Sequence, residues 1–153
     1  MEMIGTASIP RNREAAWKAL NDPEVLRRVV PGCETLEMVA DDRMRAQVAL
    51  KVGPVKARFT GDISFSDVVP PVSYVIAGEG KGGIAGFAKG TATVRLEEVG
   101  PEETLLHYHT RVDLGGKLAQ LGARLLDSTA KKLTRRFFDD FCKVFAQEAA
   151  SDE

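Results

Sequence analysis

Residues 43–52 alternate strictly between apolar and polar side chains, and this period of two constrains the fold more than any other feature of the sequence. The apolar positions of the segment are Met44, Ala46, Val48, Leu50 and Val52. Because successive side chains of a β-strand point to opposite faces, the pattern predicts a strand with one buried and one solvated face. Strands of this kind are typical of antiparallel sheets that cover a core on one side.

The same alternation recurs along much of the chain. Further strands are predicted at residues 2–10, 56–66, 73–80, 90–98 and 104–114. From residue 43 onward the connections between strands are short and contain no helix, which favours an antiparallel meander. We therefore expect one strand at the start of the chain and a run of five or six strands in its middle.

Two short helices are predicted between the first strand and this run. Residues 13–20 are strong helix formers, and Asn12 supplies their N-cap. Asp22 caps a second helix, which has Pro23 at its first position and ends at Val30, just before another proline. The buried sides of these helices are expected to contain Trp17, Leu20, Val25, Leu26 and Val29.

One long helix is predicted from Lys117 to about Glu148. Its main stripe recurs at intervals of three and four residues, and it consists of Leu118, Gly122, Leu126, Thr129, Leu133, Phe137, Phe141 and Val144. Such a stripe suits a helix that lies across a sheet. Strands in one run with helices segregated to one side indicate an α+β fold, in which a bent antiparallel sheet wraps around the long helix.

The 153 residues fit a single domain over residues 1–150, followed by a short polar tail at residues 151–153. The chain has 21 Lys and Arg against 22 Asp and Glu, a net charge of −1, so it lacks the basic surface that nucleic-acid binding requires. It also lacks a long apolar run and the layout of a secretory signal. We therefore expect a soluble, cytoplasmic protein.

Neither a metal nor another cofactor is expected. Cys33 and Cys142 lie far apart in the sequence, and in a reducing compartment both are interpreted as free thiols. His107 and His109 fall on the same face of a predicted strand, opposite its apolar face, and no cysteine lies nearby to complete a metal site.

Glycines are concentrated in one stretch of the chain, at Gly78, Gly80, Gly82, Gly83, Gly86 and Gly90. The first, second and fourth have the spacing of a dinucleotide-binding loop, but residues 83–90 are too short and too rich in glycine to form the helix on which that loop depends. Two interpretations stay open. The stretch is either a mobile hairpin loop whose Ile84 and Phe87 fold over an apolar cavity, or a flexible hairpin without a role.

A basic strip on the long helix consists of Lys131, Lys132, Arg135 and Arg136. We expect it to be a solvated helix face, and the alternative is a docking surface for an acidic partner or an anionic membrane. Phe138 would extend that docking surface if it were exposed. We favour the other arrangement, in which Phe138 and Phe145 pack on the two short helices.

The sequence offers few candidates for catalysis. It contains no serine-centred nucleophile elbow. Tyr74 and Tyr108 lie on apolar strand faces and can place hydroxyl groups in a pocket, although amphipathic residues of this kind more often only fill a core. An enzyme is therefore not the expected class.

Taken in order, the short motifs of the chain resemble the carbon monoxide dehydrogenase CoxG family, within the START-like helix-grip superfamily. The motifs that carry the resemblance are Trp17, Asp22-Pro23, Pro31-Gly32-Cys33-Glu34, Val52-Gly53-Pro54-Val55, Pro70-Pro71, Gly78-Glu79-Gly80, residues 86–90 and Gly115-Gly116-Lys117-Leu118. The resemblance implies a helix-grip fold, with a curved antiparallel sheet of about seven strands around the C-terminal helix and a cavity for an apolar ligand between them.

The resemblance also implies partners. The family is associated with aerobic carbon monoxide dehydrogenase and related molybdenum hydroxylases, and with their recruitment to the membrane. Many members carry further C-terminal sequence with a membrane-associating segment, whereas residues 149–153 alone follow Glu148 here. We therefore expect at most a peripheral contact with the inner membrane face.

These observations together predict a non-enzymatic accessory protein that binds a hydrophobic small molecule of lipid or quinone type between sheet and helix. The predicted cavity lining, in which Ile84 and Phe87 are the gating residues, is Met44, Val48, Phe59, Ile63, Phe65, Tyr74, Ile84, Phe87, Tyr108, Leu118, Leu121 and Leu125. Two alternatives stay open: an enzyme of the polyketide cyclase or hydratase kind that uses the same cavity, and a protein-protein docking module.

Overall fold

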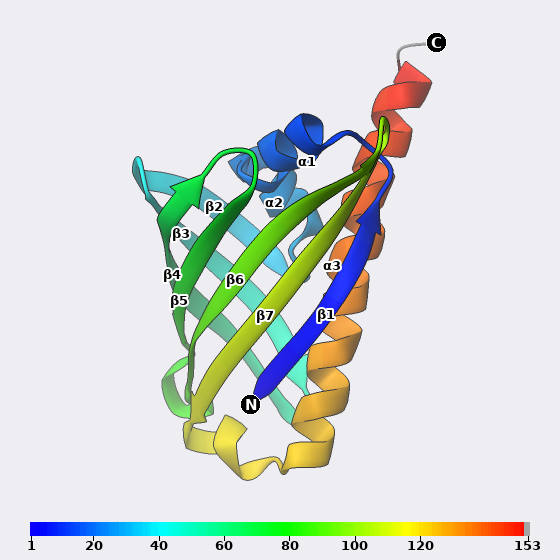
Figure 1. Cartoon of the computed structure of the whole chain (residues 1–153). Helices are drawn as coiled ribbons and strands as arrows, with labels where there is room; N and C mark the ends of the chain where they lie inside the picture. The colour runs from blue at the N-terminus through cyan, green and yellow to red at the C-terminus, as the bar shows by residue number, and fades with distance from the viewer. Residues whose placement is uncertain (152–153) are drawn as a thin grey trace.

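The computed structural model describes residues 1–151, whose strands form one curved sheet in the order β1-β7-β6-β5-β4-β3-β2 (Figure 1). The strands are β1 (Glu2–Ile9), β2 (Cys33–Ala40), β3 (Arg43–Val52), β4 (Val55–Val69), β5 (Ser73–Lys81), β6 (Phe87–Gly100) and β7 (Glu103–Gly115). Every neighbouring pair is antiparallel. The predicted α+β helix-grip fold with about seven strands is confirmed.

Two short helices, α1 (Arg13–Leu20) and α2 (Pro23–Val29), connect β1 to β2. The side chain of Asn12 accepts a hydrogen bond from the backbone N–H of Ala15 at 2.9 Å. The side chain of Asp22 accepts one from the N–H of Glu24 at 2.9 Å. Both predicted N-caps are therefore confirmed, and each satisfies a donor that the first turn of a helix leaves free.

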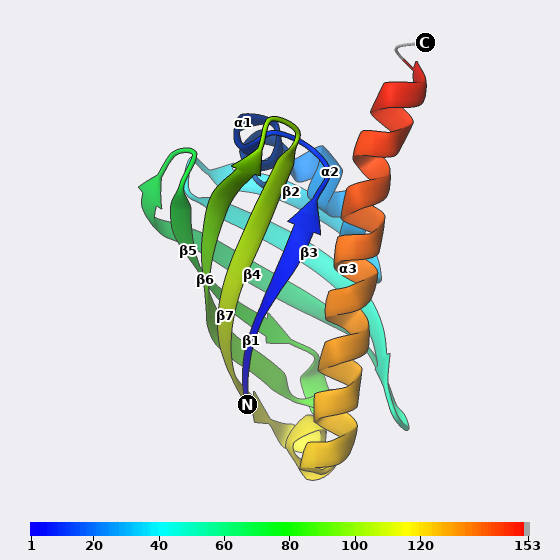
Figure 2. The ribbon, with the colours of Figure 1, turned by 45° about the vertical axis from the view of Figure 1, so that its right-hand side comes forward.

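The long helix is α3 (Ala123–Ser151), which lies across the concave face of the sheet (Figure 2). It does not begin at Lys117 as predicted, because the short 3-10 helix η2 (Gly116–Gln120) comes first and Gly122 then adopts φ +89°. A residue in this left-handed region interrupts a right-handed helix. Of the predicted polar tail, Ser151 belongs to α3, and residues 152–153 lie outside the described residues.

The strands differ most from the prediction at β6, which begins earlier, and at β2, which was not predicted. β6 begins at Phe87 rather than at Gly90, so the predicted loop over residues 83–90 shrinks to a tight turn around the 3-10 helix η1 (Gly83–Ala85). β2 has no clear alternation because it is an edge strand with irregular pairing to β3 and mostly exposed side chains. Periodicity detects strands that bury one face, so it does not detect a strand of this kind.

The inner face of the sheet carries two separate core clusters. The first joins the strand ends near α1 and α2 to the C-terminal part of α3, where Phe141, Val144 and Phe145 are buried. The second lies at the opposite end of the strands and contains Val52, Phe59, Ala85 and Leu118. Between them, α3 side chains such as Thr129 and Leu133 are only half-buried. The helix is thus held at both ends and loosely packed in its middle.

Replacement of Phe141 by alanine is expected to destabilise the fold strongly. The Phe141 side chain is 0% exposed, and its ring lies 5.3 Å from that of Phe145 and 6.0 Å from that of Phe137. Removal of a fully buried phenylalanine costs about 3–5 kcal/mol in the free energy of unfolding, which urea denaturation measures. The control is Lys143→Ala on the exposed face of the same helix, and losses of equal size would contradict the prediction.

Candidate functional site

A hollow of about 330 Å³ lies on the inner face of the sheet, between the two core clusters. The side chains that point into it come from β4 to β7, and they are Ile63, Ile76, Ala88, Ala92, Thr110 and Val112. Asp62, Glu79 and Lys89 also border it, but strand alternation directs their side chains to the other face. A volume near 300 Å³ is at the lower end of the range for small-molecule pockets, about 300–1,000 Å³.

The floor of this hollow has almost no side chains. The strand register pairs Gly61 of β4 with Gly80 of β5, and Gly80 in turn with Ala88 of β6. In the next inward-facing row, Gly78 pairs with Gly90. No side chain larger than a methyl group projects from this patch, so the hollow reaches the peptide backbone.

Of the predicted lining residues, Ile63 alone borders the described hollow, and most of the others lie in the two core clusters. Ile63 borders the hollow directly, and Met44 is its buried cross-strand partner. Phe65, Tyr74 and Tyr108 belong to or pack against the first cluster, whereas Phe59, Leu118 and Leu121 belong to or pack against the second. Val48 lies opposite Phe59 on the inner face, and Leu125 is half-buried on α3.

The sequence prediction missed the residues that lie nearest the floor. Gly61, Gly78, Gly80, Ala88 and Ala92 all occupy inward positions of their strands. The alternation that identified the large apolar residues extends to these positions too. Small side chains weaken a hydrophobic pattern, and clustered glycines were instead interpreted as a loop.

The predicted gating position of Ile84 and Phe87 is wrong. Ile84 is 84% exposed on η1. Phe87 is the first residue of β6, pairs with Gly115 and turns its ring to the outer face, where a Cβ on Gly115 would collide with it. η1 is also not a free flap, because Gly86 and Gly116 bring its backbone into close contact with η2.

The two tyrosines act as packed aromatic residues. The Tyr74 ring is 3% exposed and meets the edge of Trp17 at 5.2 Å between centroids. Burial raises the pKa of the Tyr74 phenol well above its ordinary value. Tyr108 stacks on Phe138 at 5.7 Å. Phe138 therefore packs inward and does not belong to the predicted docking surface.

The basic strip is solvent-facing along its whole length. Lys131, Lys132, Arg135 and Arg136 are all exposed on α3. Lys131 forms an ion pair with Asp127 at 3.0 Å, one turn earlier on the same helix. The other three side chains extend a positive surface over the middle of α3, on the side turned away from the sheet.

The histidines lie on the outer face of the sheet, as predicted. His107 Nε2 lies 2.9 Å from Glu97 Oε1, and His109 Nε2 lies 3.2 Å from Glu2 Oε1. Among the described residues, no three His, Cys, Asp or Glu side chains lie close enough together to hold a metal ion. Cys33 and Cys142 are both free, and partial burial raises the pKa of each thiol.

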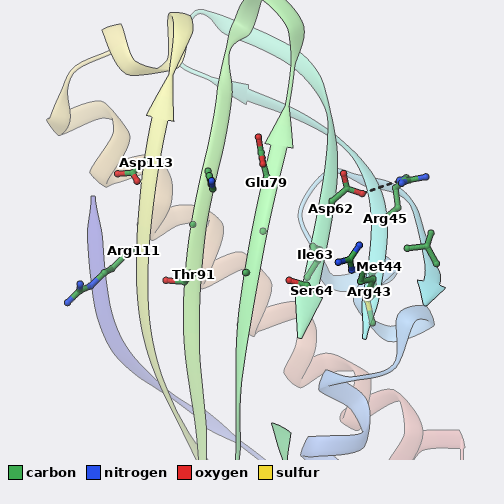
Figure 3. A pocket seen from close by; sticks show the side chains of 15 residues that line it. Arg43, Met44, Arg45, Asp62, Ile63, Ser64, Glu79, Thr91, Arg111 and Asp113 are labelled. Atoms are coloured by element: carbon green, nitrogen blue, oxygen red, sulfur yellow. Dashed lines mark hydrogen bonds and ion pairs between the residues drawn. The ribbon is translucent and has the colours of Figure 1, made fainter. Parts of the chain in front are cut away.

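A second hollow, of about 630 Å³, lies on the outer face of the same strands (Figure 3). Its side chains are mostly charged, and Arg45 and Asp62 form an ion pair across it at 3.1 Å. Arg111 and Asp113 border it from β7, and Glu79 from β5. The sheet therefore separates a charged outer hollow from an apolar inner one, and the inner one is the candidate site for an apolar ligand.

The model of the carbon monoxide dehydrogenase CoxG family matches residues 5–145. The chain belongs to the CoxG family. A conserved protein from Geobacillus kaustophilus is 30% identical and superimposes with a TM-score of 0.91, with 96% of each chain covered. A search of the curated proteins gave no match.

More distant structures share the fold of this CoxG family member. A START superfamily protein from Mycobacterium smegmatis is 14% identical with a TM-score of 0.73, covering 95% of this chain and 97% of that one. The ZhuI aromatase/cyclase from Streptomyces sp. R1128 is 11% identical with a TM-score of 0.71, covering 97% and 95%. At these identities the likeness concerns the fold alone.

The buried Tyr74 phenol is expected to make the fold sensitive to high pH. Its raised pKa means that the folded chain holds the proton more tightly than the unfolded chain, where tyrosine titrates near pH ~10. This contribution to stability is complete below pH ~10 and is lost as the pH rises above it. Between pH 8 and pH 11, the free energy of unfolding should therefore fall less for the Tyr74→Phe variant than for the unaltered protein. Urea unfolding at both pH values measures this difference. Equal losses would contradict the prediction.

Proposed function

We propose that this CoxG family member binds an apolar small molecule in the inner hollow and acts as a non-enzymatic accessory protein. The observation that carries the proposal is the apolar hollow itself, which remains between two well-packed clusters. The hollow is open on one side, and an exposed apolar concavity of this kind is typical of a ligand-binding groove. Burial of apolar ligand surface there would gain about 25 cal/mol per Å².

The polar side chains of the hollow support a binding role and not a catalytic one. Among the described side chains that point into it, Thr110 carries the single hydroxyl, which donates a hydrogen bond to the backbone oxygen of Met3 at 3.3 Å. General acid-base catalysis needs a titratable group within hydrogen-bond reach of the substrate. A cyclase or hydratase reaction would have to recruit such a group from the adjoining first cluster, where Tyr74 and Tyr108 are held in aromatic contacts.

The ligand class proposed here is an uncharged lipid or quinone, carried in support of a molybdenum hydroxylase or its recruitment to the membrane. The family match supports the partner, and the lining supports the ligand class because no cationic side chain points into the hollow to hold a carboxylate or phosphate. Within residues 1–151, no helix has both the length and the apolar composition that spanning a bilayer requires.

Filling the hollow should abolish binding. Ala92→Leu adds three carbon atoms at an inward position of β6, whereas Thr93→Leu places the same final side chain at the neighbouring position on the outer face. Fluorescence titration with N-phenyl-1-naphthylamine is expected to show saturable binding to the unaltered protein and to Thr93→Leu, and at least tenfold weaker binding to Ala92→Leu. Equal affinities in all three proteins would contradict the proposed site.

The basic strip is proposed to orient the protein on an anionic membrane surface. Each Lys or Arg near such a surface contributes about 1 kcal/mol, so Lys132→Glu with Arg136→Glu should lower binding to phosphatidylglycerol vesicles at low salt by about tenfold or more. Co-sedimentation measures the bound fraction. The control is Lys51→Glu with Lys56→Glu on the exposed β3–β4 hairpin, and the same loss there would attribute binding to overall charge instead of the strip.

A further inference from the structure

The floor of the inner hollow contains three glycines that the backbone does not require. Gly61 lies in the middle of β4, Gly78 lies inside β5, and Gly80 is the last residue but one of β5. Glycine in a strand costs stability relative to alanine, because it loses more backbone freedom on folding and has no side chain to pack. Three such positions grouped under one cavity therefore need an explanation.

Neither backbone conformation nor crowding provides that explanation. None of the three has a positive φ. A Cβ added to Gly61 would lie 3.9 Å from its nearest neighbours, one added to Gly78 would lie 3.8 Å away, and one added to Gly80 would lie 3.9 Å away. These are ordinary van der Waals separations. An alanine would therefore fit at each position without strain.

At other positions of the chain the structure does require glycine. A Cβ on Gly90 would collide with the backbone oxygen of Arg111. Gly86 and Gly116 have positive φ values and approach each other too closely for side chains. The three floor glycines have no such constraint, and their shared property is that they face the hollow.

The exposed backbone forms an area of limited size. It extends diagonally over three adjacent strands and two inward-facing rows, from Gly61 to Gly80 in one row and from Gly78 to Gly90 in the next, and the Ala88 methyl group stands at its edge. Strands lie about 4.8 Å apart and alternate residues about 6.8 Å apart, so the area measures roughly 10 by 7 Å. Ile63 and Ile76 stand at its rim.

We propose that this floor is the contact surface for a planar, uncharged ring system of two or three fused rings, laid flat against the peptide planes of β4 and β5. The inference rests on the proposed function and specifies the shape of its ligand. Dispersion contacts with the ring need an approach of about 3.5–4.0 Å to the backbone. A methyl group at Gly78 or Gly80 would hold the ring away from that surface, whereas a flexible alkyl chain would bend around it.

The test uses Gly78→Ala and Gly80→Ala, with Gly100→Ala as a matched control. A Cβ on Gly100 also meets nothing closer than 3.6 Å, and Gly100 lies at the β6–β7 hairpin, away from the hollow. The probe is N-phenyl-1-naphthylamine, whose naphthalene unit supplies two planar fused rings, and the flexible competitor is dodecanol. For each variant we measure the affinity for both compounds and, by urea unfolding, the stability of the fold.

We expect both floor variants to be at least as stable as the unaltered protein, to bind the planar probe at least fivefold more weakly, and to bind dodecanol within twofold of it. Gly100→Ala should bind both compounds as the unaltered protein does. Probe affinity that stays the same in the floor variants, or a loss of their stability, would overturn the inference and leave ligand binding standing. Failure of the unaltered protein to bind either compound would overturn the proposed function as well.

Discussion

Aromatic packing at the C-terminal end of α3 anchors the helix to the rest of the molecule. Phe141 and Phe145 meet edge to face at 5.3 Å and are buried against residues of α1, α2 and the adjoining strand ends. Arg11 lies over the Phe145 ring at 5.6 Å, which adds a cation-π contact at the surface of this cluster. At its other end the helix follows Leu118, which is buried in the second cluster. With both ends anchored, the middle of α3 can cross the sheet without filling the space beneath it.

Cross-strand register determines what lies beneath the helix. Because side chains alternate between faces, the pairing of Gly61 with Gly80 places small residues from neighbouring strands side by side on the inner face. The same register places Arg45 beside Asp62 on the outer face, where they form an ion pair. A slip of one residue in a single strand would move charges into the hollow, so the apolar character of the inner face depends on the hydrogen-bonded ladder of the whole sheet.

The parts of the fold that the sequence predicted well depend on local chemistry. Asn12 and Asp22 cap their helices as expected because an N-cap needs only a side-chain oxygen and the next few N–H groups. The prediction was less accurate where distant segments meet. β6 starts early because Phe87 pairs with Gly115 of β7, and the turn before it packs against η2, which lies far along the chain.

The sequence by itself determined the α+β class, the inner and outer faces of the strands, and the family to which the chain belongs, because each follows from short-range periodicity or from ordered motifs. Only the tertiary structure decided where the hollow lies and what forms its floor. Ile84 and Phe87 resembled cavity residues because they are large and apolar, yet they lie outside it. A cavity is defined by the side chains that are missing from a shared surface, and which small residues share that surface depends on long-range strand pairing.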